Sequence, residues 1–184
     1  MKKYLAIIAS ILLISINIEV CNAADTGPGI VTAVCLTDNK TSNLINDYNS
    51  AMDVLSFNDE KIISYNELTT KGEYNIFVST TAAKDNFIYY YYENNKLSRI
   101  IVMTGDNQTA YCEVSVLLLS LINNTDEVNS IMDAVKYSIE NKKKSMYNSI
   151  STGKTFVLDT RYNTDKSKYY IGITAQVNQL WKEV

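Results

Sequence analysis

The stretch that most constrains the fold is 72–104, where two short polar breaks separate three apolar runs. The runs are rich in tyrosine, phenylalanine, isoleucine and valine, which favour β-strands. They cover about 74–80, 86–93 and 97–104. Asn94 and Asn95 lie between the last two runs, and asparagine tolerates the positive φ angles of a two-residue hairpin turn. The stretch therefore predicts a three-stranded β-meander.

A turn at Asn94 and Asn95 predicts the register of the second and third strands. The opposed pairs are then Glu93 with Lys96, Tyr92 with Leu97, Tyr90 with Arg99, Tyr89 with Ile100, Ile88 with Ile101 and Phe87 with Val102. Large apolar side chains fall on both faces of this hairpin. One face holds Ile88, Tyr90, Tyr92, Ile101 and Met103, and the other holds Phe87, Tyr89, Tyr91, Ile100 and Val102. Such a sheet needs cover on both faces, or it presents one face to a partner.

Helical spacing of apolar residues flanks the meander on both sides. Helices are predicted from Thr41 to about residue 55, from 107 to 122 with Asp106 as N-cap, and from Thr125 to about residue 144. Two further strands are predicted at about 155–160 and 168–176, joined as a hairpin across a polar link.

Other segments are less clear. The run 30–36 reads as a strand or extended segment, and 145–153 reads as a polar link. Residues 56–71 are left without a predicted element, and the tail 177–184, with Trp181, reads as a short helix or a docked segment. The order of elements favours an α+β domain with an about five-stranded, mainly antiparallel sheet and helices packed on one face.

Residues 1–23 have the layout of a secretory signal peptide. Lys2 and Lys3 precede an apolar centre, and small residues lie near Ala23. Removal of 1–23 leaves 24–184 as one domain, exported to the periplasm or medium of a bacterium, with no membrane span expected in the mature chain.

The mature chain keeps two cysteines, Cys35 and Cys112. An exported protein with two cysteines most simply pairs them, so we expect a disulfide between them. The alternative is two buried free thiols.

The composition restricts the chemistry. There is no histidine to activate a nucleophile or bind a metal, and the net charge of −3 argues against nucleic acid as a partner. No cofactor or metal site is expected. Carboxylate chemistry is the one enzyme class that stays open, with Asp106, Glu113, Asp133 and Asp159 as candidate acids, although no recognisable spacing pairs them.

The run Tyr89, Tyr90, Tyr91 and Tyr92, with Arg99, is the remaining functional signal. Tyrosine and arginine favour recognition surfaces, although tyrosine also has high β-propensity and covers half-buried sheets. The leading hypothesis is a non-catalytic protein that binds another protein, as an inhibitor, immunity protein or assembly factor, through this tyrosine-rich sheet. The partner could also be a second subunit in a homodimer. A small-molecule or lipid carrier is the alternative, and a carboxylate-based hydrolase is the third hypothesis.

Overall fold

The computed structural model describes residues 33–37, 40–71 and 74–177. In chain order, these form β1 (Ala33–Val34), α2 (Thr41–Val54), the 3₁₀ turn η1 (Asn58–Glu60), β2 (Ile62–Lys71), β3 (Tyr74–Thr81), β4 (Phe87–Glu93), β5 (Lys96–Thr104), α3 (Asn107–Ile122), the 3₁₀ turn η2 (Thr125–Glu127), α4 (Val128–Asn141), β6 (Lys144–Ser149), β7 (Lys154–Asn163) and β8 (Lys168–Val177). The predicted signal peptide and the tail with Trp181 lie outside the described residues.

Seven of the described strands form one open antiparallel sheet in the order β2-β3-β4-β5-β8-β7-β6, and β1 pairs with the end of β8. Two meanders, β2 to β5 and β6 to β8, are joined where β5 pairs with β8. The prediction of an α+β fold with a mainly antiparallel sheet is confirmed, and the sheet is wider than the five strands expected.

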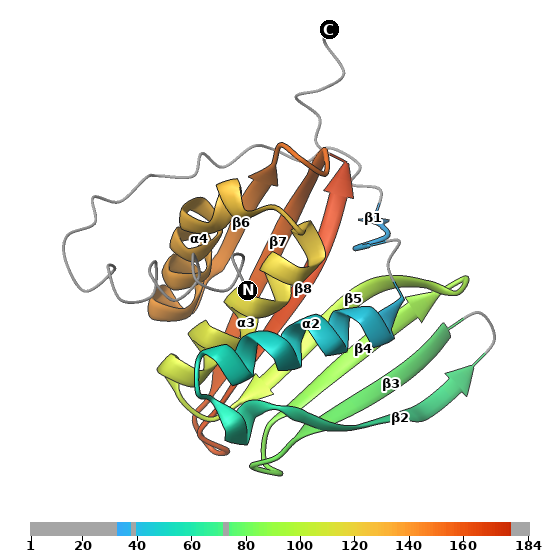
Figure 1. The fold of residues 1–184 in the computed structure, drawn as a ribbon, viewed down its shortest axis with the longest axis vertical. Coiled ribbons are helices and arrows are strands. Elements are labelled where there is room, and N and C mark those ends of the chain that lie inside the picture. Colours follow the sequence, from blue (N-terminus) through green and yellow to red (C-terminus); the bar gives the residue numbers. More distant parts are fainter. Residues whose placement is uncertain (1–32, 38–39, 72–73, 178–184) are drawn as a thin grey trace, which may run out of the picture.

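The three helices of the described residues pack on one face of the sheet (Figure 1). Helix α3 lies over β5 and β8, α4 lies over β6 and β7, and α2 packs against α3 on the β2–β5 side. The core fills the space between. Its largest fully buried side chains are Leu36, Tyr48, Met52, Ile88, Tyr90, Ile100, Leu117, Leu118, Ile131, Met132, Phe156 and Leu158.

Strands β2 and β6 are the two that the apolar pattern does not reveal. The segment expected to be a polar link is β6, whose inward side chains are Ser145, Tyr147 and Ser149. Two of these hydroxyls bind polar groups of the helix layer: Ser145 Oγ donates to Ala134 O at 2.9 Å, and Tyr147 OH donates to Glu127 Oε2 at 2.5 Å. A strand with buried hydroxyls lacks the apolar alternation that predicts strands.

The β4–β5 hairpin follows the predicted register only next to the turn. Asn94 and Asn95 have φ angles of 51° and 60°, and Tyr92 faces Leu97 as expected. Tyr91 then faces Arg99, so Ser98 is an extra residue in a β-bulge.

The bulge moves the rest of β5 to the opposite face from the one predicted. The observed pairs are Tyr90 with Ile100, Tyr89 with Ile101, Ile88 with Val102 and Phe87 with Met103. The predicted register beyond Leu97 is therefore wrong by one residue. A one-residue insertion exchanges the two faces because side chains alternate along a strand.

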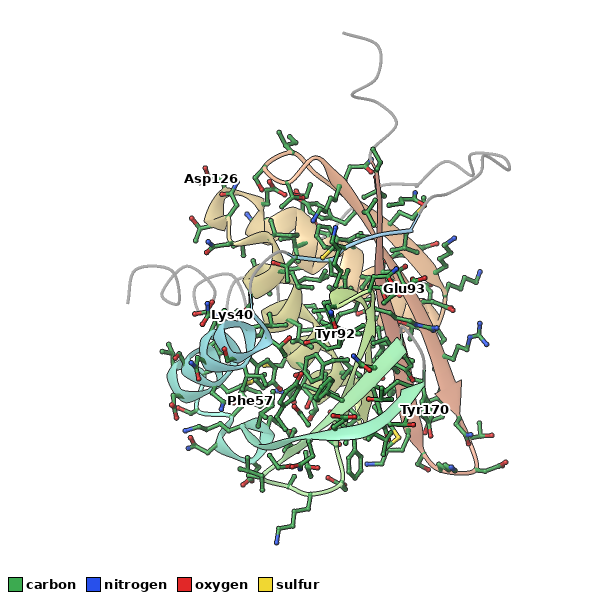
Figure 2. All side chains as sticks on the ribbon, turned by 90° about the vertical axis from the view of Figure 1, so that its right-hand side faces the viewer. Lys40, Phe57, Tyr92, Glu93, Asp126 and Tyr170 are labelled. Atoms are coloured by element: carbon green, nitrogen blue, oxygen red, sulfur yellow. The ribbon has the colours of Figure 1, made fainter. Side chains whose placement is uncertain are left out.

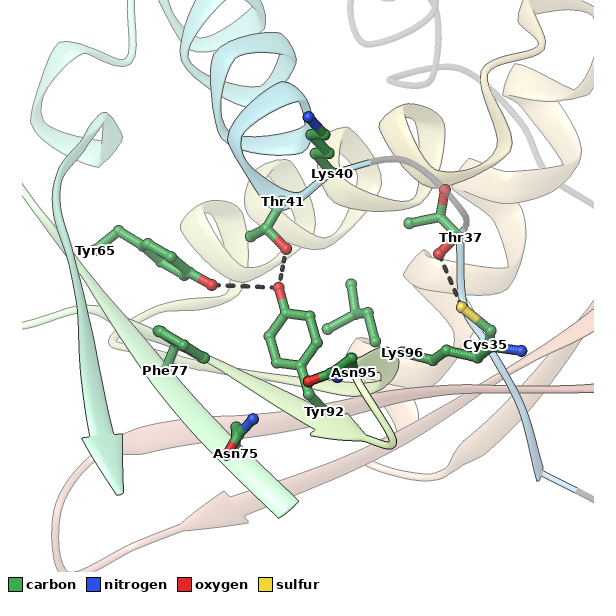
Figure 3. A pocket seen from close by; sticks show the side chains of 11 residues that line it. Cys35, Thr37, Lys40, Thr41, Tyr65, Asn75, Phe77, Tyr92, Asn95 and Lys96 are labelled. Atoms are coloured by element: carbon green, nitrogen blue, oxygen red, sulfur yellow. Dashed lines mark hydrogen bonds between the residues drawn. The ribbon is translucent and has the colours of Figure 1, made fainter. Parts of the chain in front are cut away.

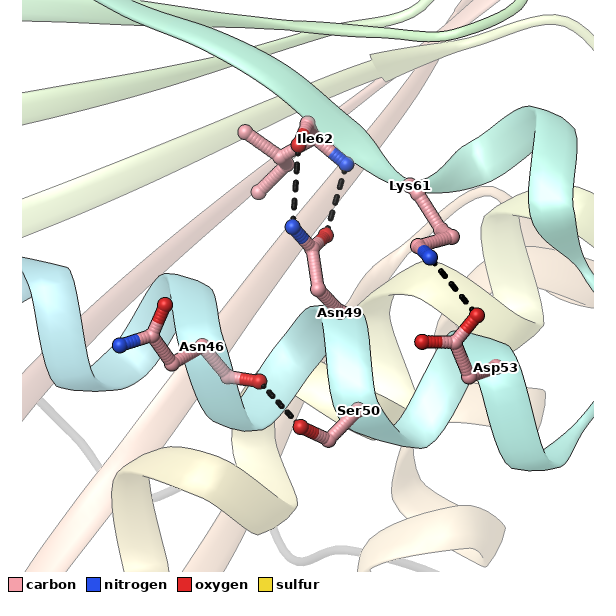
Figure 4. Close-up of polar contacts among 6 residues, drawn as sticks. All are labelled: Asn46, Asn49, Ser50, Asp53, Lys61 and Ile62. Carbon is pink, nitrogen blue, oxygen red and sulfur yellow. Dashed lines mark hydrogen bonds and ion pairs between the residues drawn. The ribbon is translucent and has the colours of Figure 1, made fainter.

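Helix α2 is fastened to the start of β2 by polar contacts (Figure 4). The Asn49 amide makes two hydrogen bonds with the Ile62 backbone: its Oδ1 accepts from N at 2.8 Å, and its Nδ2 donates to O at 3.0 Å. Lys61 Nζ lies 2.7 Å from Asp53 Oδ1 in the next turn of the helix. These contacts set where α2 crosses the sheet.

The predicted disulfide is wrong: Cys35 and Cys112, the cysteines in the described residues, are both free thiols. Leu36 N donates to Leu97 O at 2.8 Å, which places Cys35 near the start of β5. Cys112 lies in α3, which begins after the far end of β5, and its Sγ is 3.9 Å from Met52 Sδ. Cys35 thus lies beside the start of β5, whereas Cys112 lies in the helix that follows the end of that strand.

Candidate functional site

The sheet face opposite the helices carries a continuous strip of apolar side chains. We call it the uncovered face, because no helix of the described residues lies on it (Figure 1). The register assigns to the middle of this face Ile76, Val78, Phe87, Tyr89, Tyr91, Arg99, Ile101, Met103, Val157 and Tyr170. In Figure 2, Tyr92 lies on the helix side of the sheet and Tyr170 on the other side.

Cross-strand rows make this strip continuous. One row runs through Val78, Tyr89, Ile101 and Gly172, one residue from each of four adjacent strands. Phe87 and Tyr89 are next to each other on β4, with ring centroids 6.5 Å apart. These apolar side chains are half-buried by one another. The strip therefore lies open on its outer side.

The structure divides the four consecutive tyrosines between the two faces. Tyr89 and Tyr91 lie on the uncovered face, whereas Tyr90 is fully buried under the helices and Tyr92 is half-buried on the helix side. The surface that can meet a partner therefore contains Tyr89, Tyr91 and Arg99 of the predicted residues. The side chain of Tyr90 belongs to the core.

Arg99 lies at the centre of the uncovered face. Its Cζ is 5.9 Å from the centroid of the Tyr91 ring, within the range of a cation–π contact. Burial, with the neighbouring phenols of Tyr91 and Tyr170, raises the pKa of Tyr89 above its ordinary value. The site thus combines tyrosine rings with the exposed guanidinium of Arg99.

No protein-family model, curated protein or solved structure matches this chain.

Sequence reasoning did not assign Ile76, Val78 and Tyr170 to the candidate surface. The alternation along β3 and β8 contains these residues, but their place depends on which strands are neighbours. β5 pairs with β8 across both helices and two intervening strands, and no short-range pattern specifies that pairing.

A second candidate site is a cleft of about 500 Å³ on the helix side (Figure 3). It lies between the residues before α2 and the strands β2 to β5, and its lining comprises Cys35, Thr37, Lys40, Thr41, Tyr65, Asn75, Phe77, Tyr92, Asn95, Lys96 and Leu97. Its size is in the range of small-molecule pockets.

Aromatic rings form the inner wall of the cleft. Tyr65 stacks on Phe77 with centroids 5.0 Å apart, and Phe77 meets the Tyr92 ring edge-on at 5.5 Å. The Tyr92 hydroxyl bonds with the Thr41 hydroxyl and with the Tyr65 hydroxyl, the latter at 3.2 Å. Burial and the Tyr65 hydroxyl raise the pKa of Tyr92, so this phenol stays neutral. Asn75 Oδ1 is buried here without a hydrogen-bond partner.

The candidate acids of the hydrolase hypothesis lie apart. Asp106 caps α3 as predicted, accepting from Thr109 N at 2.9 Å, and Asp159 pairs with Arg161 at 3.1 Å. Asp133 is exposed on α4, and Glu113 is buried in α3.

Within residues 33–37, 40–71 and 74–177, no three His, Cys, Asp or Glu side chains form a metal-binding group. In the same part of the chain, no helix is both long enough and apolar enough to cross a membrane.

Proposed function

We propose that this chain is a non-catalytic exported bacterial protein that binds another protein through the uncovered face, as an inhibitor, immunity protein or assembly factor. The observation that carries the proposal is the position of Tyr89, Tyr91 and Arg99. They form the middle of a continuous apolar strip on the sheet face that the described helices leave open.

The chemistry of this face suits protein recognition. Tyrosine and arginine are enriched at interfaces and among the residues that carry most of the binding energy. Burial of apolar area contributes about 25 cal/mol per Å² to the free energy of binding. The rings of this face are half-buried and are already held by their neighbours. Their ordering therefore costs little conformational entropy on binding.

The charges on the face indicate the partner's chemistry. Arg99 is exposed and has no ion pair in the described residues, whereas the nearby Arg161 already pairs with Asp159. The best complement is an apolar protein surface that carries a carboxylate opposite Arg99. Such a pair would be bidentate and would specify the orientation of the partner.

The test uses the mature chain as bait in the periplasmic and culture fractions of its native bacterium. We expect one protein whose recovery falls at least about tenfold for Tyr89→Ser with Tyr91→Ser, the fold-change that 1.4 kcal/mol produces. The matched control is Tyr137→Ser, which removes an exposed tyrosine of α4 on the helix side. Equal recovery by all three proteins would contradict the proposal.

A homodimer has to be distinguished from a complex with a different protein. Sedimentation at several concentrations would show it as self-association that the double substitution abolishes and Tyr137→Ser leaves intact. That result would make the partner a second copy of the chain.

The cleft beside Tyr92 favours a second candidate function, a small-molecule or lipid carrier. Aromatic walls with Lys40 and Lys96 among the lining suit a ligand with an apolar body and an anionic group. Native mass spectrometry of protein purified without denaturant tests this function. A bound small molecule that Phe77→Ala removes supports the carrier, and an empty protein opposes it.

A further inference from the structure

A row of polar side chains is buried on the helix-covered face at the end of the sheet farthest from the β4–β5 turn. Thr80, Phe87 and Met103 are cross-strand partners on β3, β4 and β5. The next row therefore contains Thr81, Asn86 and Thr104, with Asn86 in the middle. Thr81 N donates to Asn86 O at 3.2 Å, in keeping with this row. Thr81 and Thr104 are 0 % exposed and Asn86 is 4 % exposed.

Two carboxyl groups approach this row from the helix layer. Glu113 extends from α3 and is 0 % exposed. Glu60 lies at the end of η1, and its Oε2 accepts from Asn86 Nδ2 at 2.7 Å. Burial and the nearby Glu60 carboxylate raise the pKa of Glu113 well above its ordinary value, and the side chains of Thr104 and Asn86 are close enough to oppose that shift.

Several oxygens in this cluster have no partner at full hydrogen-bonding geometry. They are both carboxylate oxygens of Glu113 and the hydroxyl oxygens of Thr81 and Thr104. Buried polar atoms are almost always paired, and an unpaired buried carboxylate is among the most costly groups in a protein. Lys61, which follows Glu60 in the chain, is already paired with Asp53. A bound cation would give these oxygens a partner.

We propose that Glu60 and Glu113, with the oxygens of Asn86 and Thr104, bind a divalent calcium ion. Two carboxylates balance two positive charges, and the amide and hydroxyl oxygens supply neutral ligands of the type that calcium accepts. Magnesium fits less well because it keeps several waters in a strict octahedron, which a buried cluster has little room for. This site is independent of the uncovered face and of the proposed partner.

The competing explanation is a shared proton. Glu113 can carry a proton and donate it to Glu60, which removes the need for a cation. The titratable groups around Glu113 are Glu60 on η1, Tyr48 on α2, Tyr90 on β4 and the adjacent Cys112 of α3 itself. None of them carries positive charge, so only the cation explanation predicts saturable metal binding.

Calorimetric titration of the chelator-treated mature protein with CaCl₂, and separately with MgCl₂, tests the proposal. We expect one calcium per chain, weaker magnesium binding, and a melting temperature that rises with calcium concentration because the ion binds only the folded chain. Glu113→Gln should weaken calcium binding at least about tenfold, the lower end of the loss seen when a group that supports a metal site is removed. Glu140→Gln removes an exposed carboxylate of α4 and should change nothing.

A second variant covers the case in which Glu113→Gln does not fold. Thr104→Val keeps the side-chain shape and removes only the hydroxyl oxygen, so it should fold and still weaken binding. Terbium luminescence excited through tyrosine gives an independent readout, because the Tyr48 hydroxyl bonds Glu60 O at 3.1 Å. Absence of calcium binding by the wild type at millimolar concentration, or equal affinity in Thr104→Val and wild type, would overturn the proposal.

Discussion

The guanidinium of Arg99 lies directly over Gly172, so that a Cβ at Gly172 would be 3.2 Å from Nη2 of Arg99. Arg99 and Gly172 belong to adjacent strands, β5 and β8, in the middle of the uncovered face. The absence of a side chain at 172 lets the arginine lie flat on the sheet while it contacts the Tyr91 ring. The glycine therefore shapes the centre of the proposed binding surface.

Gly172→Ala should displace Arg99 without unfolding the protein. The close atom is the end of a flexible side chain, and Gly172 has an ordinary strand backbone, so alanine should leave stability unchanged or raise it by up to about 1 kcal/mol. Partner recovery should nevertheless fall, because the guanidinium must shift beside Tyr91 to make room for the methyl group. Urea denaturation and the pull-down together check this. Unchanged recovery with a displaced Arg99 would show that its position is unimportant.

Neighbouring tyrosines of β4 should differ sharply in their effect on stability. Tyr90→Ala removes a fully buried ring and should lower the free energy of unfolding by about 3–5 kcal/mol. Tyr91→Ala removes a half-buried ring on the uncovered face and should cost about 1 kcal/mol or less. Chemical denaturation of both variants measures the difference. Equal losses would mean that the Tyr91 ring is as deeply buried in solution as the Tyr90 ring.

Glu127 should make stability depend on pH in the acid range. Burial alone would raise the pKa of Glu127, but hydrogen bonds from Tyr147 and Ser151 outweigh burial and hold the pKa below its ordinary value. The folded state therefore favours the carboxylate. The resulting stability is fully present above the unfolded pKa of about 4.3 and is lost as pH falls through the folded pKa.

Glu127→Gln tests this linkage. It should cost about 1.5–3 kcal/mol at pH 7, the contribution of hydrogen bonds to a charged group, and the difference from wild type should shrink as the pH falls below about 4. Denaturation curves from pH 3 to pH 7 measure it, with Glu140→Gln as the exposed control. A difference that is constant over this range would contradict the assigned role of the carboxylate.

The two free thiols should react at very different rates. The Sγ of Cys35 donates to Thr37 O at 2.8 Å. Because Cys35 is only half-buried, it should react with iodoacetamide in the folded protein. Cys112 is 3 % exposed and should react only after denaturation. Peptide mapping of non-reduced protein distinguishes the sites. A cross-linked peptide that joins both cysteines would contradict the free thiols.

Local patterns predicted much of the fold because the responsible interactions are short-range. Helical spacing predicted α2, α3 and α4, Asp106 was correctly predicted to cap α3, and Asn94 and Asn95 were correctly predicted to form a turn. Strand β6 escaped prediction because its inward side chains are polar, and Ser145 is satisfied by Ala134 O of α4, a partner that lies outside any local window.

The candidate site was predictable only in part. The sequence indicated a tyrosine-rich hairpin with two apolar faces, which the structure bears out in outline. The bulge at Ser98, where Ser98 Oγ donates to Tyr91 O at 3.1 Å, exchanged the β5 residues of the two faces. A bulge depends on the fit between strands, which the apolar pattern does not encode when both faces are apolar.

The sequence by itself determined the class of fold and the main elements, because periodicity, capping and turn propensity act between near neighbours in the chain. The tertiary structure alone decided that β5 lies beside β8, that Tyr89 and Tyr91 share a face with Tyr170, that Cys35 and Cys112 lie apart, and that Glu113 meets Glu60. Each of these relationships joins residues that are distant in the chain. They follow from how the helices and strands pack together, and any function of this protein depends on them.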